Sequence, residues 1–468
     1  MPGLPPIVFS ASSPALMRYL FKCCKVYKFF IFEFLFKISL YQLLKTKIPF
    51  FLFMIKIIKK IMNDSLYKNS IYLMMSTGIM SLFGFIFWLV IARLFDTHDV
   101  GLATTIISVM SLITGFSVLG LNIALIKYLP HAKDKSKKIN TSFTIVAIVS
   151  VIVASVYLLG IERFSPDLLF IKENLILAFS FILFMVLSSF NSISESVFVA
   201  FRNTKYILIK NTIFSGSKII IPFGFVALGF VGAYVIFSSW MIGLFISFCF
   251  SIFILVKKFN YEPKFVYHSS IIEKIGKYSF GNYLAGFIGG LPLMILPLMI
   301  TNIINPTTTA YYYIAMMIAG LLFAVPAAAT QSLFAEGSHN EKELGKQIKK
   351  AVKIIALILI PGILITIFFG QYILLAFGKE YSSEGMGLLR ILAVSGIFVS
   401  ANSIFGNILR VRNRIFAFVS VNILRAVVMI GSIYLLVDKG LVGVGYGWLI
   451  GSFATTLFYI GVLLVGRR

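Results

Sequence analysis

Acidic residues are scarce in this sequence. Only 17 of its 468 residues are Asp or Glu, against 42 Lys or Arg, and charged residues make up 13 % of the chain. Soluble domains carry about 25 % charged residues, so this chain lacks the polar surface that a soluble multidomain enzyme needs. The formal charge of +25 would suggest nucleic-acid binding in a soluble protein. In a membrane protein such an excess marks loops on the cytoplasmic side.

Motifs for catalysis and redox chemistry are missing as well. The three cysteines, Cys23, Cys24 and Cys249, have neither the number nor the spacing of a disulfide framework or a metal site. The four histidines lie scattered outside the apolar runs, and no Walker motif for nucleotide phosphates occurs. We therefore expect no enzyme, no cofactor and no metal.

Long apolar runs dominate what is present. The chain is 59 % hydrophobic with a mean hydropathy of +0.96, and a bilayer core of about 30 Å needs roughly 20 mainly apolar residues per helix. The sequence therefore predicts an all-α membrane protein with twelve transmembrane helices. They are expected near residues 69–92, 100–126, 140–160, 174–200, 206–228, 231–256, 279–302, 308–334, 352–376, 387–409, 415–437 and 441–464.

The charges of the loops predict the orientation of these helices. Alternate loops, together with the C-terminal tail, hold 23 Lys or Arg, whereas the intervening loops hold five. By the positive-inside rule, both ends of the twelve-helix body lie in the cytoplasm. The intervening loops are also short, the longest being about 13 residues. No outer domain is left for catalysis, which again argues against an enzyme.

Residues 1–61 form a basic and aromatic extension whose lysines interrupt every apolar run. One interpretation is an interfacial anchor on anionic lipid. The favoured interpretation is that this segment is not native and that translation starts at Met62. The rest of the chain divides into an N-lobe (62–256, helices one to six), a cytoplasmic linker (257–278) and a C-lobe (279–468, helices seven to twelve).

The two lobes carry matching sequence features. The turn Gly229–Gly232 recurs at Gly440–Gly443, 211 residues later, and Asn422 follows Asn211 at the same offset. Six predicted helices separate each pair, so both lobes have the same orientation in the membrane. The sequence thus indicates a parallel 6+6 repeat, an architecture common among transporters.

Four motifs in the first two predicted helices resemble a known family. They are Ala92-Arg93-Leu94-Phe95, Val100-Gly101-Leu102, Leu119-Gly120-Leu121-Asn122 and Lys127-Tyr128-Leu129-Pro130. With the two Gly-x-x-Gly turns, they resemble the oligosaccharide-lipid flippases, the O-antigen and polysaccharide transporters of the multidrug/oligosaccharidyl-lipid/polysaccharide exporter superfamily. The resemblance covers residues 62–468. It implies two six-helix lobes around a cavity that opens alternately to each side, and a substrate of sugars on a polyprenyl pyrophosphate carrier.

Basic residues inside predicted helices are the main candidates for substrate binding, because charges at membrane depth are costly. Lys218 and Arg425 lie deep in their helices. For each of them, two roles are equally plausible: the side chain lines the substrate cavity, or it forms a structural pair inside the protein. Arg390 lies near the outer end of its helix, where snorkelling to the interface is favoured. Arg93 is a further candidate because it belongs to the family motif. Cations at these places would suit an anionic pyrophosphate.

Polar residues without a positive charge complete the candidates. Asn122, Asn282 and Gln331 can bind glycan hydroxyls, although hydrogen bonds between helices explain such amides equally well. Glu195 is either the partner of Arg202, which is favoured, or a coupling site for protons.

Helix seven is predicted to bend. It contains Gly289, Gly290, Pro292 and Pro297, and prolines and glycine pairs are the usual causes of helix kinks. Bending helices allow two lobes to rock against each other, so we expect the hinge of the transporter here.

The sequence thus predicts a flippase that moves polyprenyl-pyrophosphate-linked oligosaccharide across the cytoplasmic membrane of a prokaryote by alternating access. The expected partners are membrane lipids and enzymes of glycan assembly, without nucleic acid. One alternative is a multidrug or organic-cation exporter of the same superfamily, which should carry a buried acid in its cavity. Another is a polytopic glycosyltransferase or polymerase, which needs a large outer loop or an acidic cluster.

Overall fold

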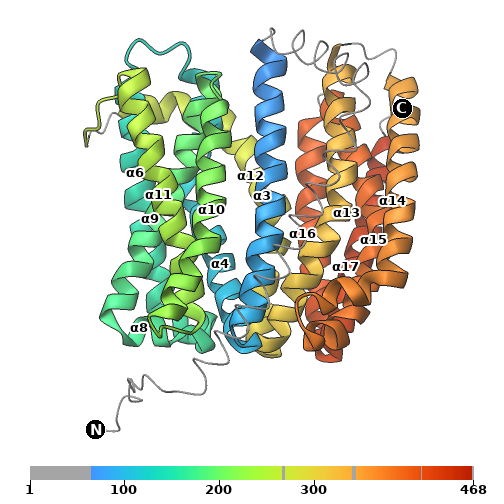
Figure 1. The fold of residues 1–468 in the computed structure, drawn as a ribbon. Helices are drawn as coiled ribbons and strands as arrows, with labels where there is room; N and C mark the ends of the chain where they lie inside the picture. The colour runs from blue at the N-terminus through green and yellow to red at the C-terminus, as the bar shows by residue number, and fades with distance from the viewer. Residues whose placement is uncertain (1–64, 266–268, 340–343, 413, 466–468) are drawn as a thin grey trace, which may run out of the picture.

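A computed structural model describes residues 65–265, 269–339, 344–412 and 414–465 (Figure 1). The extension 1–61 lies outside the described residues. All regular elements in the described part are helices, and every predicted run corresponds to helical structure. Ten segments are long and apolar enough to cross a membrane, the last of which, Phe416–Leu464, contains two helices. Lys205, Lys210 and Lys218 lie in one further helix, α10, that also has the length of a span.

The N-lobe and the C-lobe each contain six membrane-spanning segments. The N-lobe consists of α3 (Ser65–Leu94), α4 (Thr97–Val118) with α5 (Leu121–Tyr128), α6 (Lys135–Leu159), α9 (Leu175–Ala200), α10 (Lys205–Ala227) and α11 (Ala233–Phe259). Three short elements, α7 (Ile161–Phe164), η1 (Pro166–Leu168) and α8 (Phe170–Glu173), form its outer loop. The C-lobe consists of α12 (Ser269–Ile303), α13 (Pro306–His339), α14 (Leu344–Leu375), α15 (Lys379–Val411), α16 (Ile415–Leu436), the short η3 (Val437–Lys439) and α17 (Gly440–Val465).

Helix packing repeats between the lobes, as the sequence predicts. In each lobe the first span packs against the fifth, the fifth against the sixth, and the second against the third and fourth. Asn211 and Asn422 take matching places: the amide of Asn211 donates to Ser76 of α3 at 2.9 Å, and that of Asn422 lies against Gly289 of α12. Each lobe thus ties its fifth span to its first with the same residue type.

The second span is broken where the family motif Leu119-Gly120-Leu121-Asn122 occurs. Leu119 and Gly120 adopt left-handed backbone conformations (φ +49° and +78°), which end α4 and redirect the chain into α5. The corresponding span of the C-lobe, α13, continues as one helix with Pro326 inside it. The break leaves the carbonyl of Gly115 in α4 without its ordinary helical partner, and the Tyr283 hydroxyl donates to it.

Buried apolar residues show how the lobes meet. Toward the outer side they form one continuous cluster that includes both lobes, from Phe87 and Val100 to Phe377 and Trp448. Toward the cytoplasm they form separate clusters: one lies wholly within the N-lobe, and the smaller ones lie wholly within the C-lobe. Among the described side chains, buried apolar contacts therefore join the lobes on the outer side, whereas toward the cytoplasm the buried clusters stay within one lobe each.

A close contact between the lobes joins the starts of α4 and α13. A Cβ atom at Gly101 would lie 1.7 Å from the carbonyl oxygen of Pro306, so the two backbones touch. Beside them, the buried hydroxyls of Thr105 and Thr301 lie 2.6 Å apart, and Thr301 also contacts Thr309 at 2.8 Å. Only a glycine permits this approach.

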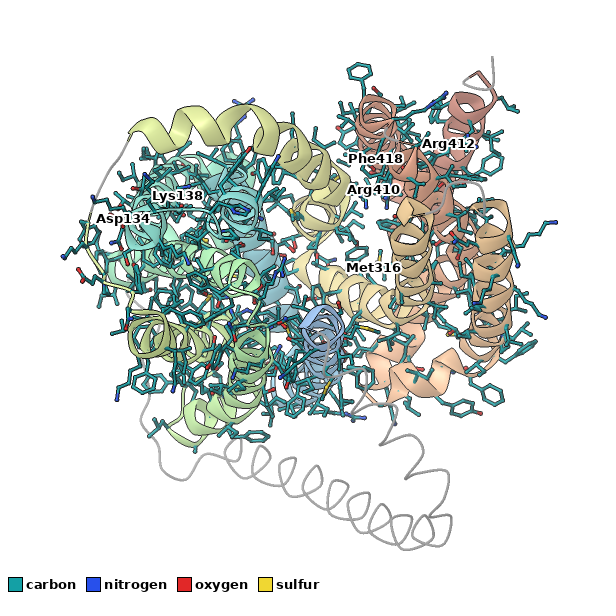
Figure 2. All side chains as sticks on the ribbon, turned by 90° about the horizontal axis from the view of Figure 1, so that it is seen from above. Asp134, Lys138, Met316, Arg410, Arg412 and Phe418 are labelled. Carbon is teal, nitrogen blue, oxygen red and sulfur yellow. The ribbon has the colours of Figure 1, made fainter. Side chains whose placement is uncertain are left out.

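Helix α12 belongs to both lobes. It begins over the cytoplasmic end of the N-lobe and then descends between the lobes (Figures 1 and 2). Its residues Tyr283 and Phe287 contact Gly115 and Phe116 of α4, whereas Gly289 packs on α16. Helix α12 starts at Ser269, within the segment predicted as linker, because the lysines there interrupt the apolar run but not the helix.

The chain before α12 is fastened to the N-lobe. The buried amide of Asn140 in α6 donates to the carbonyl of Glu262 at 2.8 Å, and its oxygen accepts from the Tyr261 hydroxyl and from the backbone N–H of Lys264. Residues 261–264 are thus held on α6 and cannot act as a free hinge.

We predict that Gly101→Leu opens the outer side, because the added side chain needs the space that the carbonyl of Pro306 occupies. The measurement is labelling of Thr301→Cys, a position that is 2 % exposed, by a membrane-impermeant maleimide in a background without other cysteines. Labelling should rise several-fold over the same protein with Gly101. The matched control is Gly78→Leu, since nothing lies within 4 Å of a Cβ atom there. Unchanged labelling in Gly101→Leu would contradict the closure described above.

Candidate functional site

Arg93 closes the outer side rather than facing an open cavity in this structure. Its Nε and Nη2 atoms donate to the carbonyls of Ala376 and Leu375 at 2.7 and 2.8 Å. These carbonyls lie at the C-terminal end of α14, where helical acceptors lack partners and carry partial negative charge. Next to this contact, Thr97 donates to the carboxylate of Glu380 at 2.8 Å. Arg93 is an exposed residue whose guanidinium joins α3 of the N-lobe to the end of α14 in the C-lobe.

Lys218 lies inside the N-lobe and is 2 % exposed. Its ammonium nitrogen is 4.1 Å from the ring centroid of Trp240, 4.8 Å from that of Phe214 and 5.2 Å from that of Phe87. Within the described chain no carboxylate lies within 4.0 Å of it. The sequence leaves cavity lining and structural pairing as equal alternatives for Lys218. The structure shows a third arrangement, in which aromatic rings surround the ammonium group.

Glu195 pairs with Lys210, so the favoured partner Arg202 is wrong. The carboxylate of Glu195 in α9 lies 3.0 Å from the ammonium of Lys210 in α10, which also donates to the amide oxygen of Asn191. Lys210 is fully buried, whereas the Glu195 side chain is 38 % exposed. In the sequence, Lys210 lies near the cytoplasmic end of a helix, where the positive-inside rule alone explains a lysine. No local sequence pattern predicts its ion pair with a residue of another helix.

A cationic cluster without a carboxylate lies toward the cytoplasmic end of the C-lobe. Arg410 of α15 stacks on Phe418 of α16 at 4.2 Å (Figure 2). Arg425, two turns further along α16, has a buried Nε atom without a hydrogen-bond partner. The hydroxyl of Tyr459 in α17, which is 3 % exposed, lies against Gly406, one turn before Arg410 in α15.

The geometry of this cluster depends on a small residue. A Cβ atom at Gly406 would lie 3.1 Å from the Tyr459 hydroxyl and 3.2 Å from the ring of Phe418. The absence of a side chain at Gly406 therefore lets α15 carry Arg410 close to both rings. The sequence predicts Arg425 as a candidate, whereas Arg410 lies at a helix end, where loop charge alone explains an arginine, and no sequence pattern indicates Tyr459.

Arg390 lies on the exposed face of α15. That face also carries the exposed apolar residues Val394 and Ile397, which are typical of a surface toward lipid. This placement fits snorkelling along the lobe surface.

Binding of glycan hydroxyls by Asn122, Asn282 and Gln331 stays a prediction. The amide oxygen of Asn122 accepts the backbone N–H of Ile123 at 2.9 Å, just after the break in the second span. The side chains of Asn282 and Gln331 lie outside the described residues.

The predicted hinge residues lie where α12 passes from one lobe to the other. Gly289 lies against the side chain of Asn422. Pro292 and Pro297 follow inside the helix and remove two backbone hydrogen bonds. The part of α12 before Gly289 contacts the N-lobe, so a bend at these residues would let each part follow its own lobe.

Two models of known protein families match parts of this chain. The family model described as "Polysaccharide biosynthesis protein" matches residues 66–335, which is more than half of the sequence. The chain belongs to this family. A second model, MatE, matches residues 291–435 in the C-lobe. A search of curated proteins finds no match.

Several solved structures have the same fold as this chain. The lipid II flippase MurJ in an inward closed conformation has a TM-score of 0.69 at 14 % identity, over 83 % of this chain and 86 % of that one. A multidrug resistance MATE family transporter of the MOP superfamily in an inward-facing conformation has a TM-score of 0.66 at 16 % identity, over 85 % of this chain and 98 % of that one. An outward-facing conformation of such a transporter scores 0.57 at 16 % identity, over 86 % and 96 %. The chain thus shares its fold with these transporters.

We predict that Glu195→Gln lowers the thermal unfolding midpoint of the purified protein, because it leaves the fully buried Lys210 with only the amide of Asn191. The loss should be smaller than the about 3–5 kcal/mol typical of fully buried pairs, since water reaches Glu195. The double variant Glu195→Gln with Lys210→Met should recover most of the loss because it also removes the buried charge. A double variant no more stable than Glu195→Gln would show that Lys210 is not stabilised by this carboxylate.

Proposed function

We propose that this protein is a flippase that carries polyprenyl-pyrophosphate-linked oligosaccharide from the cytoplasmic to the outer leaflet of a prokaryotic cell membrane by alternating access. The observation that carries the proposal is the division of the buried core. Among the side chains that the structure describes, one buried apolar cluster joins the lobes on the outer side, whereas the clusters toward the cytoplasm each stay within one lobe. A transporter in this state receives its substrate from the cytoplasmic side.

The charge of the cytoplasmic half supports an anionic head group. Arg410 stacks on Phe418, and Arg425 lies on the same helix as Phe418 with a buried Nε atom that lacks a hydrogen-bond partner; neither has a carboxylate within ion-pairing distance in the described chain. A guanidinium matches phosphate oxygens in a two-pronged geometry, and the surrounding low dielectric strengthens the attraction. We assign the pyrophosphate to this cluster, with the polyprenyl chain remaining in lipid.

The alternative of an organic-cation exporter finds less support. Such a protein needs a buried acid for its substrate, and the acid that the described membrane interior offers, Glu195, already pairs with Lys210. The hydrogen bonds of Arg93 to the end of α14 would break when the lobes part on the outer side, which suits a residue that meets the head group late in the cycle. Enzymes of glycan assembly would supply the substrate and use it after transport.

A disulfide across the outer junction should stop transport. Thr105→Cys with Thr301→Cys joins the lobes at hydroxyls that lie 2.6 Å apart. In a background with serine at positions 23, 24 and 249, the oxidised protein should lose transport of a lipid-linked oligosaccharide in proteoliposomes, measured by a lectin added outside the vesicles. Reduction should restore it. The control pair is Ser150→Cys with Ser189→Cys, whose hydroxyls lie 2.7 Å apart within the N-lobe; its disulfide should leave transport intact. Full transport by the oxidised Thr105–Thr301 pair would refute alternating access.

Arg425→Gln should reduce transport in the same assay at least tenfold, because it removes an unpaired cation from the proposed pyrophosphate site. Arg390→Gln removes the same charge from an exposed face and serves as the matched control. Equal transport by Arg425→Gln and Arg390→Gln would move the pyrophosphate site elsewhere. If the unmodified protein transported tetraphenylphosphonium and not the glycan lipid, the organic-cation exporter would be favoured.

A further inference from the structure

Three aromatic rings surround an ammonium group inside the N-lobe. Phe87 comes from α3, Phe214 from α10 and Trp240 from α11, and all three ring centroids lie within 5.2 Å of the Lys218 nitrogen. The rings also contact one another: Phe87 and Trp240 are 5.5 Å apart, and Phe214 and Trp240 are 5.4 Å apart. We call Phe87, Phe214 and Trp240 the aromatic cage.

The faces of the three rings offset the unfavourable burial of the Lys218 ammonium. Lys218 is 2 % exposed, and within the described residues no Asp or Glu forms an ion pair with it. Burying a lone ammonium is strongly unfavourable. The face of an aromatic ring attracts a cation, most strongly for tryptophan, and such contacts reach about 2 kcal/mol when water is excluded. The shortest distance of the three is indeed to Trp240.

The approach of α10 to α11 leads the lysine into the cage. A Cβ atom at Gly243 would lie 3.1 Å from the backbone nitrogen of Lys218 and 3.3 Å from its Cβ atom. A larger residue at position 243 would therefore press on Lys218 itself. The backbone is placed so that the four-carbon side chain ends among the rings.

The cage lies directly behind a contact between the lobes. Trp88 follows Phe87 in α3, and its ring lies 6.3 Å from that of Trp240. On its other side it lies 4.7 Å from the ring of Tyr313 in α13 of the C-lobe. The rings around the ammonium thus continue without interruption into the outer junction.

We propose that the aromatic cage is a binding site for a primary alkylammonium ion, that Lys218 fills it from within the chain, and that the bound cation holds Trp88 against Tyr313. Lys218 then acts on the closure of the outer side and does not contact the transported molecule. This inference does not depend on the flippase proposal, since it concerns a site within the N-lobe and its contact with α13.

Chemical rescue tests the site directly. Lys218→Ala in the full-length purified protein removes three methylene groups and the ammonium, which together correspond to n-propylammonium. The variant should have a lower thermal midpoint than the original protein. Millimolar n-propylammonium chloride should restore the midpoint in a saturable way, whereas 1-propanol, the neutral probe of equal length, should not. The original protein, whose cage is filled, should respond to neither.

Lys218→Met serves as the second variant because it keeps most of the side-chain volume without the charge. Its thermal midpoint should also fall, and n-propylammonium should not restore it, because the cage is occupied. In both variants, outside labelling of Thr301→Cys should rise, and in Lys218→Ala n-propylammonium should lower it again. The proposal is overturned if 1-propanol rescues Lys218→Ala as well as n-propylammonium does. It is also overturned if Lys218→Met matches the original protein in midpoint and labelling.

Discussion

The contact between Gly101 and the carbonyl of Pro306 is the constraint on which the rest of the arrangement depends. It lets α4 and α13 approach at backbone distance, which brings Thr105 to Thr301 and places the end of α3 beside the end of α14. The shared core on the outer side follows from this junction. Within the described part of the chain, no buried apolar cluster of this kind joins the lobes toward the cytoplasm.

Most of the basic side chains inside the protein are stabilised by groups other than carboxylates. Lys210 has a carboxylate, Lys218 has ring faces, and Arg93 has the open carbonyls of a helix end. Arg425 has a tyrosine hydroxyl nearby and an unsatisfied nitrogen. The first three already have partners, whereas Arg425 retains binding capacity. This difference, rather than depth in the membrane, separates structural cations from the one we assign to the pyrophosphate.

Much of the fold could be predicted from the sequence, because span length, loop charge and the repeat are all local or periodic signals. Orientation and the twelve spans depend only on hydropathy and on which loops carry lysine and arginine. The motif around Leu119 and Gly120 was visible, but its break in the second span was not, since a left-handed leucine depends on tertiary contacts. The partners of Glu195 and Lys218 could not be predicted, because they come from separate helices whose rotation about their axes the sequence does not specify.

The fastening of residues 261–264 to α6 has a mechanical consequence. Asn140 holds the backbone of Lys264, and α12 begins at Ser269, so only a short stretch of chain joins the fastened point to the next helix. At about 3.6 Å per residue, this tether reaches at most about 18 Å. The tether therefore limits how far the start of α12 can move from the N-lobe at any stage of transport. The first part of α12 therefore stays with the N-lobe, and any separation of the lobes has to occur further along the helix, near Gly289.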